Sequence, residues 1–249
     1  MLFFKKNKKE RFDYRLIGAD MHSHLLPGID DGSPHITTSV ELVKGLHDLG
    51  YTTLITTPHI MRDMYPNTPE IIAARLKELQ SSLEQSGIPV TIQAAAEYFL
   101  DEYVEDLLKQ KEPLLTIKDN WVLCEFSLAF ASRGLKDILF EMQMQGYQPV
   151  IAHPERYIYL QQEKSFFDEL KDTGCYFQLN IGALCGYYGK SVQELAEYLI
   201  KKGYYDLVGT DLHNIRHLEM LEDATLSSPL QHLLDTGRIR NGELAAPGV

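Results

Sequence analysis

Residues 18–32 read GADMHSHLLPGIDDG, and this stretch says more about fold and function than any other in the 249-residue chain. His22 and His24 stand two positions apart, directly after a short apolar run. Side chains at positions i and i+2 of a strand point to the same side, so both imidazoles can reach one metal ion from a strand end. The glycine turn that follows brings Asp30 and Asp31 back towards the same place. A His-x-His sequence alone fits local hydrogen bonding as well as metal binding, so the rest of the chain has to decide.

Short β-rich runs alternate with helical patterns along the chain. The expected strands cover residues 16–19, 52–56, 91–95, 121–125, 149–152, 176–179 and 206–209. The tripeptide TPE at 68–70 begins a helix well, because threonine caps it, proline suits the first helical position and an acid follows; Gly87 ends that helix. A second helix runs through 194–199 and ends at Gly203. Seven strand–helix alternations predict an α/β fold with a parallel sheet.

Closed on itself, such a sheet forms a single distorted (β/α)7-type barrel that resembles a TIM barrel, for which about 250 residues is a usual length. An open doubly wound sheet is the alternative, but no glycine-rich phosphate-binding sequence follows the first strand. We expect one domain at residues 16–240. A basic N-terminal tail at 1–15 and a C-terminal tail at 241–249 flank it.

The composition excludes several classes of protein. The formal net charge of −11 argues against nucleic acid as a partner, because proteins that bind it usually show a basic surface. No run of 18 apolar residues predicts a membrane span, and the first residues lack the order of a secretory signal. Three widely spaced cysteines predict neither a disulfide framework nor a cysteine-based zinc site, which favours the cytoplasm. The oligomeric state stays open.

Polar side chains that bind metals follow most of the expected strands. After His22 and His24 they are His59, Glu97, Glu125, His153, Asp211 and His213. From His24 to His153 they recur every 28 to 38 residues, about the length of one βα unit, and the carboxyl ends of barrel strands converge where active sites lie. Any one of them alone is better explained as a structural histidine or a surface acid. Together they need cationic compensation, and nitrogen and oxygen donors without thiolate suit Mn²⁺, Fe, Zn²⁺ or Co²⁺.

Six segments carry a family resemblance: DMHSHLLPGIDDG, TPHI, AAEYF, CEF, AHPERY and GTDLHN. They resemble the PHP superfamily and, within it, the bacterial protein-tyrosine phosphatases encoded with capsule and exopolysaccharide genes. The resemblance covers about residues 20–214 and implies that 16–240 is a PHP metallophosphatase domain. It also implies three divalent metal ions, with manganese the first choice. The implied substrate is a phosphotyrosine protein, the tyrosine-rich tail of a cognate bacterial tyrosine kinase that controls polysaccharide synthesis.

The resemblance also assigns roles to individual residues. The implied metal ligands are His22, His24 and Asp211 for a first ion, Glu125 and His153 for a second, Asp31, His59 and His213 for a third, and Glu97 as a bridging carboxylate. Arg156 in AHPER matches a catalytic arginine. Arg216 lies near the position of another, although the spacing within NIRHLEML differs. Asp211 counts as catalytic too, because a histidine or metal-bound water near it is the candidate general acid.

Other activities remain open at this point. A cysteine phosphatase needs arginine six positions after its cysteine, whereas Phe130, Ile181 and Ser191 stand at those positions. A small-molecule phosphatase of the histidinol-phosphate type can use the same metals, and a metal-dependent nuclease or a non-catalytic module are further alternatives. Aromatic residues near the strand ends favour a phenyl ring as ligand. These are Tyr65, Tyr98, Phe99, Tyr157, Tyr187 and Tyr188.

Overall fold

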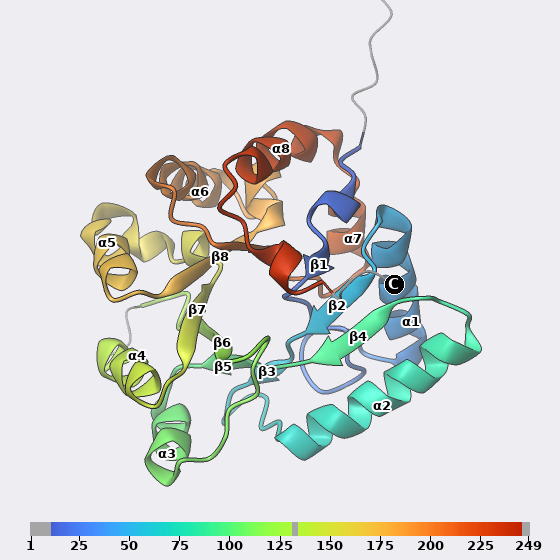
Figure 1. Cartoon of the computed structure of the whole chain (residues 1–249), viewed down its shortest axis with the longest axis horizontal. Helices are drawn as coiled ribbons and strands as arrows, with labels where there is room; N and C mark the ends of the chain where they lie inside the picture. The colour runs from blue at the N-terminus through green and yellow to red at the C-terminus, as the bar shows by residue number, and fades with distance from the viewer. Residues whose placement is uncertain (1–10, 131–133, 246–249) are drawn as a thin grey trace, which may run out of the picture.

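The computed structural model describes residues 11–130 and 134–245, so residues 1–10 of the predicted basic tail and the last four residues of the chain lie outside it (Figure 1). The strands are β1 (Ala19–Asp20), β2 (Thr53–Thr56), β3 (His59–Ile60), β4 (Thr91–Ala94), β5 (Glu97–Phe99), β6 (Trp121–Glu125), β7 (Gln148–Ala152), β8 (Tyr176–Asn180) and β9 (Leu207–Gly209). The α-helices are α1 (Ile36–Leu49), α2 (Pro69–Gln85), α3 (Glu102–Gln110), α4 (Leu135–Met144), α5 (Ser165–Asp172), α6 (Lys190–Lys202), α7 (Ile215–Leu221) and α8 (Ser227–Asp235). Six short 3₁₀ helices occupy Tyr14–Leu16, Pro154–Arg156, Ile158–Gln162, Ile181–Cys185, Ala224–Leu226 and Asn241–Glu243.

All strand pairs are parallel and form two sheets, ordered β1-β2-β4 and β3-β5-β6-β7-β8-β9. Two residues separate β2 from β3, and two separate β4 from β5. The ladder nevertheless continues across both breaks, since Ala95 N donates to Thr56 O over 2.9 Å and Glu97 N donates to Pro58 O over 3.1 Å. Proline lacks the N–H that a ladder needs, which explains the break at Pro58. The second and third predicted strands are therefore confirmed as β2 and β4, and each is followed after two residues by a short strand that was not predicted.

The first and last strand positions also meet. Asp211 N donates to His22 O over 2.7 Å, and His24 N donates to Leu212 O over 2.9 Å. Seven strand positions thus follow one another around the molecule, with the α-helices outside them (Figure 1). The predicted α/β fold of the (β/α)7 type is confirmed.

The chain before and after the predicted domain packs on it. Phe12 and Tyr14 are buried in the core, and Leu244 is buried beneath the strands. The Asn241 side chain donates to Val208 O over 2.7 Å and to Ala19 O over 2.9 Å, so it bridges β1 and β9. The packed body therefore extends from at least Phe12 to Leu244.

The first strand differs from its prediction at 16–19. Residues Tyr14–Leu16 form a 3₁₀ turn, which Asp13 caps by accepting from Arg15 N over 3.1 Å. Leu16 is 56% exposed, and Gly18 has a φ of +90° that no strand residue adopts. The strand accordingly begins only at Ala19.

The three predicted helix boundaries are confirmed. Thr68 caps α2 and accepts from Ile71 N over 3.4 Å, and Gly87 follows the helix with a φ of +65°. Gly203 ends α6 with a φ of +67°. Both glycines take the left-handed conformation that usually closes a helix.

Side chains of alternate strand residues fill the inside of the ring. This inner cluster contains Met21, Ile55, Leu123, Val150 and Leu207 and is apolar throughout. A larger apolar cluster lies between the strands and the helices. Because side chains alternate along a strand, the inward row of β6 runs from the apolar cluster to Glu125 at the carboxyl end.

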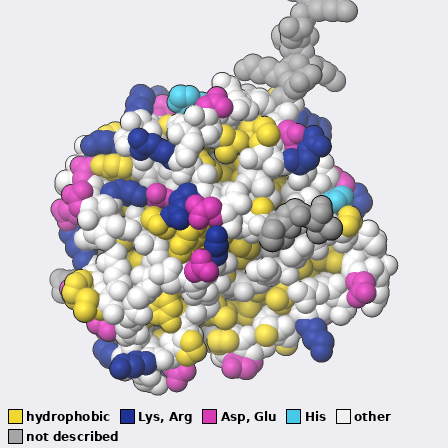
Figure 2. All heavy atoms as spheres, in the orientation of Figure 1, with side chains coloured by type: hydrophobic (Ala, Val, Ile, Leu, Met, Phe, Trp, Pro, Cys, Tyr) yellow, Lys and Arg dark blue, Asp and Glu magenta, His cyan; other side chains and the backbone are white. Residues whose placement is uncertain are grey.

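The surface shown in Figure 2 carries acidic and basic side chains scattered among each other rather than gathered by sign. This face lacks the basic patch that a nucleic-acid-binding surface shows. Among the described helices, none is both long enough and apolar enough to cross a membrane.

Candidate metal centre

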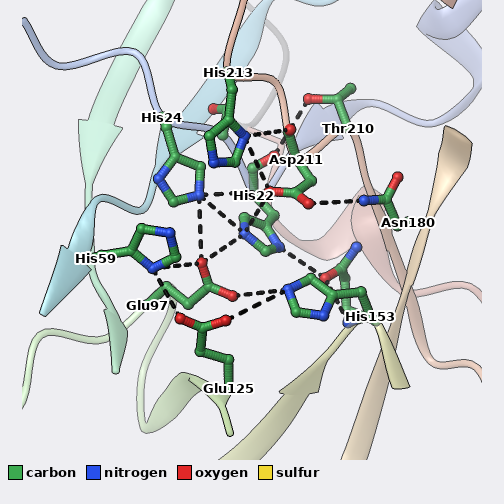
Figure 3. A network of polar contacts seen from close by, with 12 residues as sticks. His22, His24, His59, Glu97, Glu125, His153, Asn180, Thr210, Asp211 and His213 are labelled. Carbon is green, nitrogen blue, oxygen red and sulfur yellow. Dashed lines mark hydrogen bonds and ion pairs between the residues drawn. The ribbon is translucent and has the colours of Figure 1, made fainter. Parts of the chain in front are cut away.

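The nine predicted ligands meet at the carboxyl end of the ring, and Figure 3 labels all of them except Asp31. They come from the segment after β1 (His22, His24, Asp31), from β3 (His59), β5 (Glu97) and β6 (Glu125), from the residue after β7 (His153), and from the segment after β9 (Asp211, His213). A cavity of about 460 Å³ opens above them. Convergence follows from parallel pairing, because every strand ends at the same face.

Glu97 lies at the centre of the cluster and is fully buried. Its Oε2 is 3.1 Å from His22 Nε2, and 3.3 Å from both His24 Nε2 and His59 Nδ1. Its Oε1 is 3.1 Å from His153 Nε2. One carboxylate among four imidazoles has the position expected of a ligand shared between metal ions.

Three histidines have their tautomer fixed by a hydrogen bond at Nδ1. His22 Nδ1 lies 2.8 Å from Gln178 Oε1, and His24 Nδ1 lies 2.8 Å from Asp30 Oδ2. His213 Nδ1 lies 2.8 Å from the carbonyl of Asp211. Each of these oxygens can only accept, so Nδ1 carries a proton and Nε2 is the nitrogen that faces the cluster. Metal-binding histidines are oriented by such partners.

The two carboxylate oxygens of Asp211 face different groups. Oδ1 lies 3.3 Å from His22 Nε2 and 3.5 Å from His24 Nε2. Oδ2 accepts from Arg156 Nη1 over 2.9 Å and from Asn180 Nδ2 over 2.8 Å. One oxygen is thus free for a cation while the other is held in place. The φ of +51° at Asp211 is unusual for a residue other than glycine and typical of strained functional sites.

The outer edge of the cluster is more open. The Asp31 side chain is 52% exposed, and its Oδ1 lies 3.4 Å from His59 Nε2 and 3.5 Å from His213 Nε2. Hydrogen bonds from these two histidines hold the pKa of Asp31 well below its usual range. His59 lies between two carboxylates. Its Nε2 faces Asp31, and its Nδ1 lies 3.0 Å from Glu125 Oε1.

The electrostatics of the cluster favour bound cations. Burial opposes protonation, yet Asp30 raises the pKa of His24 well above its usual value and Glu97 raises the pKa of His22. Against the same burial, carboxylates raise the pKa of His59 to about 10. Conversely, burial opposes ionisation of Glu97, but His22 and His59 hold its pKa well below the usual range. Bound protons thus neutralise the carboxylates, a role that divalent metals can take over.

The donor set fits metal ions in chemistry and in spacing. Four groups of ligand atoms lie within 4.8 Å of one another: His22, His24 and Asp211; His22, Glu97 and His153; His59, Glu97 and Glu125; and His24, Asp31, His59 and His213. Among the residues that the structure describes, the buried Nδ1 atom of His59 makes no hydrogen bond, although carboxylate oxygens of Glu97 and Glu125 lie 3.3 Å and 3.0 Å from it. A nitrogen held this close to two carboxylates without a hydrogen bond fits a cation shared among the three groups.

The two predicted arginines differ in position. Arg156 lines the cavity, and its guanidinium carbon lies 4.9 Å from the centre of the Tyr188 ring. Arg216 is exposed and is absent from the residues that line the cavity, so this geometry gives its predicted catalytic role no support. Asn214 caps α7 and accepts from His217 N over 3.2 Å. In that helix His217, rather than Arg216, faces the cavity beside His213.

The predicted aromatic residues also divide into those that line the cavity and those that do not. Tyr65, Phe99 and Tyr188 line the cavity, and the Tyr65 ring stacks on His59 with 5.4 Å between ring centres. Tyr157 is instead buried in the core, where it stacks on Phe126. The other two also lie outside the cavity lining: Tyr98 is buried, and Tyr187 is 41% exposed and meets His217 edge-on.

Sequence reasoning missed the residues that support the ligands. Asn180 ends β8, at the strand-end position where Glu125 ends β6, but the predicted strand stopped one residue earlier. Gln178 is a fully buried polar residue inside β8, which is an unusual place for a glutamine. Asp30 lies beside the predicted ligand Asp31, and only the turn geometry shows that it supports His24.

A parallel ring of strands with imidazole and carboxylate donors at its carboxyl end defines the class of metal-dependent α/β-barrel enzymes. A family model for capsular polysaccharide synthesis proteins, CpsB/CapC, matches residues 18–224, and the chain belongs to this family. The family resemblance read from the sequence is confirmed.

Several relatives are tyrosine phosphatases by name. Tyrosine-protein phosphatase YwqE of Bacillus subtilis (strain 168) is 30% identical over 198 residues, which cover 79% of this chain and 78% of YwqE. Tyrosine-protein phosphatase CpsB of Streptococcus pneumoniae is 29% identical over 202 residues, which cover 79% of this chain and 83% of CpsB. A crystal structure, from work on YwqE and CpsB as "unique metal-dependent tyrosine phosphatases", matches with a TM-score of 0.77 and 27% identity, covering 91% of this chain and 89% of its own.

More distant structures share the fold alone. An amidohydrolase from Mycoplasma synoviae matches with a TM-score of 0.52 at 14% identity, covering 96% of this chain and 89% of its own.

Proposed function

We propose that this protein is a metal-dependent protein-tyrosine phosphatase that hydrolyses phosphotyrosine through a metal centre and without a cysteine nucleophile. One observation carries the proposal: nitrogens of oriented imidazoles and three buried carboxylates converge on one space under an open cavity. Membership in the CpsB/CapC family and the names of the relatives support it. The described cysteines are free, and burial raises the pKa of the Cys124 thiol well above its usual value, so it is a poor nucleophile.

We propose three divalent ions, with manganese the first choice and iron, zinc or cobalt as alternatives. The proposed ligands are His22, His24 and Asp211 for one ion, Glu125 and His153 for a second, and Asp31, His59 and His213 for a third, with Glu97 as the bridging carboxylate. Close groups of donor atoms support the first and third sets, and for the second set His153 Nε2 lies 4.0 Å from Glu125 Oε2. A single metallophosphatase domain supplies all of them.

When bound, divalent ions supply Lewis acidity and neutralise charge on the phosphoryl group. Arg156 is a cation on the cavity wall, and although burial opposes its charge, Asp211 raises its pKa. Only Nη1 is engaged by Asp211, which leaves other guanidinium donors for phosphoryl oxygens. Packing against Tyr188 fixes the plane of the guanidinium. We propose that Arg156 orients the phosphoryl group above the metal ligands.

The cavity wall on the side of β3, β5 and β6 suits an aromatic leaving group. Met64, Tyr65, Phe99 and Leu128 line this side. Ring contacts of this kind contribute about 0.5–1.5 kcal/mol each. A tyrosyl oxygen has a pKa near 10, so it leaves with less protonation than an alkyl alcohol needs.

We propose that the biological substrate is the tyrosine-phosphorylated tail of a bacterial tyrosine kinase that controls capsule or exopolysaccharide synthesis, and that the enzyme meets it in the cytoplasm. The family's role in capsular polysaccharide synthesis supports this proposal.

A substrate panel tests the activity. Purified protein with Mn²⁺ is given a phosphotyrosine peptide, the matched phosphoserine peptide, histidinol phosphate and single-stranded DNA. We expect kcat/KM for phosphotyrosine to exceed that for phosphoserine by about tenfold or more, since two ring contacts amount to about 1.4 kcal/mol. A preference for histidinol phosphate or for DNA would replace the proposal with a small-molecule phosphatase or a nuclease.

A further inference from the structure

A second hollow of about 640 Å³ lies beside the catalytic cavity. Its walls come from the loops after β3, β5 and β6, which are neighbours in the sheet. Phe99 lines both hollows. Met61 and Leu128 line the cavity, and their chain neighbours Arg62 and Ser127 line the hollow. The hollow, which we call the side groove, is therefore continuous with the site proposed to bind phosphotyrosine.

The side groove offers apolar surface to a ligand. Phe130 lines it and is 65% exposed, although it is a large hydrophobic side chain. Leu100 and Ile138 close the floor and are buried. Leu128 and Met64 of the adjoining cavity are exposed as well, and a group of exposed apolar side chains, unlike a single one, is typical of a surface that binds another chain.

The polar lining of the side groove is mostly acidic. Its carboxylates are Asp63, Asp101, Glu102 and Glu105, and its cation is Arg62. Arg62 lies over the Tyr103 ring at 5.7 Å, and Glu105 pairs with Lys109 at 3.2 Å. Burial, followed by the negative charge of Asp63, raises the pKa of Asp101, so these carboxylates lie close enough to repel one another.

The catalytic cavity and the side groove thus attract opposite charges. The cavity has Arg156 and the ligand set for cations, and it suits the phosphoryl group. The side groove suits an ammonium or guanidinium group. An extended chain advances about 3.3 Å per residue, so a few residues connect the two hollows.

We propose that the side groove binds the polypeptide on one side of the phosphotyrosine and selects substrates with Lys or Arg within about four residues of it. This inference rests on the proposed phosphatase function and adds a peptide specificity to it. The groove makes the enzyme prefer phosphotyrosine within a peptide over free phosphotyrosine.

The test compares phosphotyrosine peptides that carry Lys or Glu two and three residues before the phosphotyrosine, or two and three residues after it. With Mn²⁺, we expect kcat/KM for the Lys peptide to exceed that for the Glu peptide by about five- to tenfold on one side only, because two partly exposed charge pairs contribute that much. The preference should shrink at high salt.

Two variants locate the effect. Asp63→Asn/Glu102→Gln removes two exposed acids of the side groove, and we expect it to reduce the Lys preference to below about twofold. Glu84→Gln/Glu197→Gln makes the same change of net charge at exposed positions of α2 and α6, outside both hollows, and should leave the preference intact. Hydrolysis of free phosphotyrosine should be equal in all three proteins.

Equal rates for Lys and Glu peptides on both sides, with phosphotyrosine still hydrolysed, would overturn the side-groove proposal and leave the phosphatase function standing. An equal loss of preference in both double variants would assign it to overall charge and also overturn the proposal. Failure to hydrolyse any phosphotyrosine substrate would remove the proposed function, and the side-groove specificity with it.

Discussion

The inside of the strand ring and its carboxyl end are built from the same strands but from opposite chemistry. On β6, Leu123 belongs to the apolar inner cluster, and Glu125, two residues further on, lies among the histidines. On β7, Val150 lies in the inner cluster, and His153 follows the strand end. On each strand, only two or three residues therefore separate the side chain that packs in the inner cluster from the side chain that belongs to the polar cluster. Stability and chemistry are thus assigned to different layers of one barrel.

Glu97→Gln should have the largest effect, because it removes the carboxylate that four imidazoles share while keeping its size. We expect kcat for a phosphotyrosine peptide with Mn²⁺ to fall by about a hundredfold or more, as for loss of a central electrostatic group. Bound metal, measured by elemental analysis, should fall as well. A fully active, folded Glu97→Gln protein would show that the cluster is not the catalytic layer.

Leu123→Ala should lower the stability of the protein and leave kcat nearly unchanged. It removes a fully buried side chain of the inner cluster and should lower the free energy of unfolding by about 2–5 kcal/mol. Urea titration measures this change, and kcat of the protein that remains folded at low temperature should change less than about threefold. A large loss of kcat with little change in stability would contradict the separation into layers.

Asn180→Ala tests the support of the ligands. Asn180 Nδ2 holds Oδ2 of Asp211, and loss of a partner behind a metal ligand typically reduces metal affinity by about 10- to 100-fold. We therefore expect more Mn²⁺ to be needed for half-maximal activity, with most of kcat recovered at excess Mn²⁺. Asn120→Ala is the matched control, because that exposed asparagine donates to Gly146 O far from the site. An unchanged Mn²⁺ requirement in Asn180→Ala would leave Asn180 with a purely structural role.

The smallest predicted effect is the release of protons when metal binds. The pKa of His59 is raised to about 10, so this histidine holds a proton at neutral pH in the absence of metal, and carboxylates also raise the pKa values of His22 and His24. Metal binds neutral imidazole, so binding should release protons, and apparent affinity should rise with pH up to about 10, where His59 loses its proton. Calorimetric titration with Mn²⁺ in buffers of different ionisation enthalpy measures the release. Identical heats in all buffers would mean that no proton leaves.

The sequence was sufficient to predict the positions of the ligands at the strand ends, but not the residues that hydrogen-bond to these ligands. The position of Glu125 could be predicted, because a short apolar strand that ends in a polar residue is a local pattern and parallel strands end at one face. Gln178 could not, because its partner His22 is 156 positions away and only the closed ring brings them together. The position of Arg216 relative to the cavity could not be predicted either, because it depends on where α7 begins: Arg216 is exposed, whereas its neighbour His217 lines the cavity.

Removal and return of metal test the central claim most directly. The protein is stripped with a chelator, shown to be metal-free by elemental analysis, and assayed on a phosphotyrosine peptide before and after Mn²⁺, Co²⁺, Zn²⁺ or Mg²⁺ is added back. The account predicts that the stripped protein is folded and inactive, and that Mn²⁺ restores activity with up to three ions bound per chain. Full activity in the metal-free protein would contradict it.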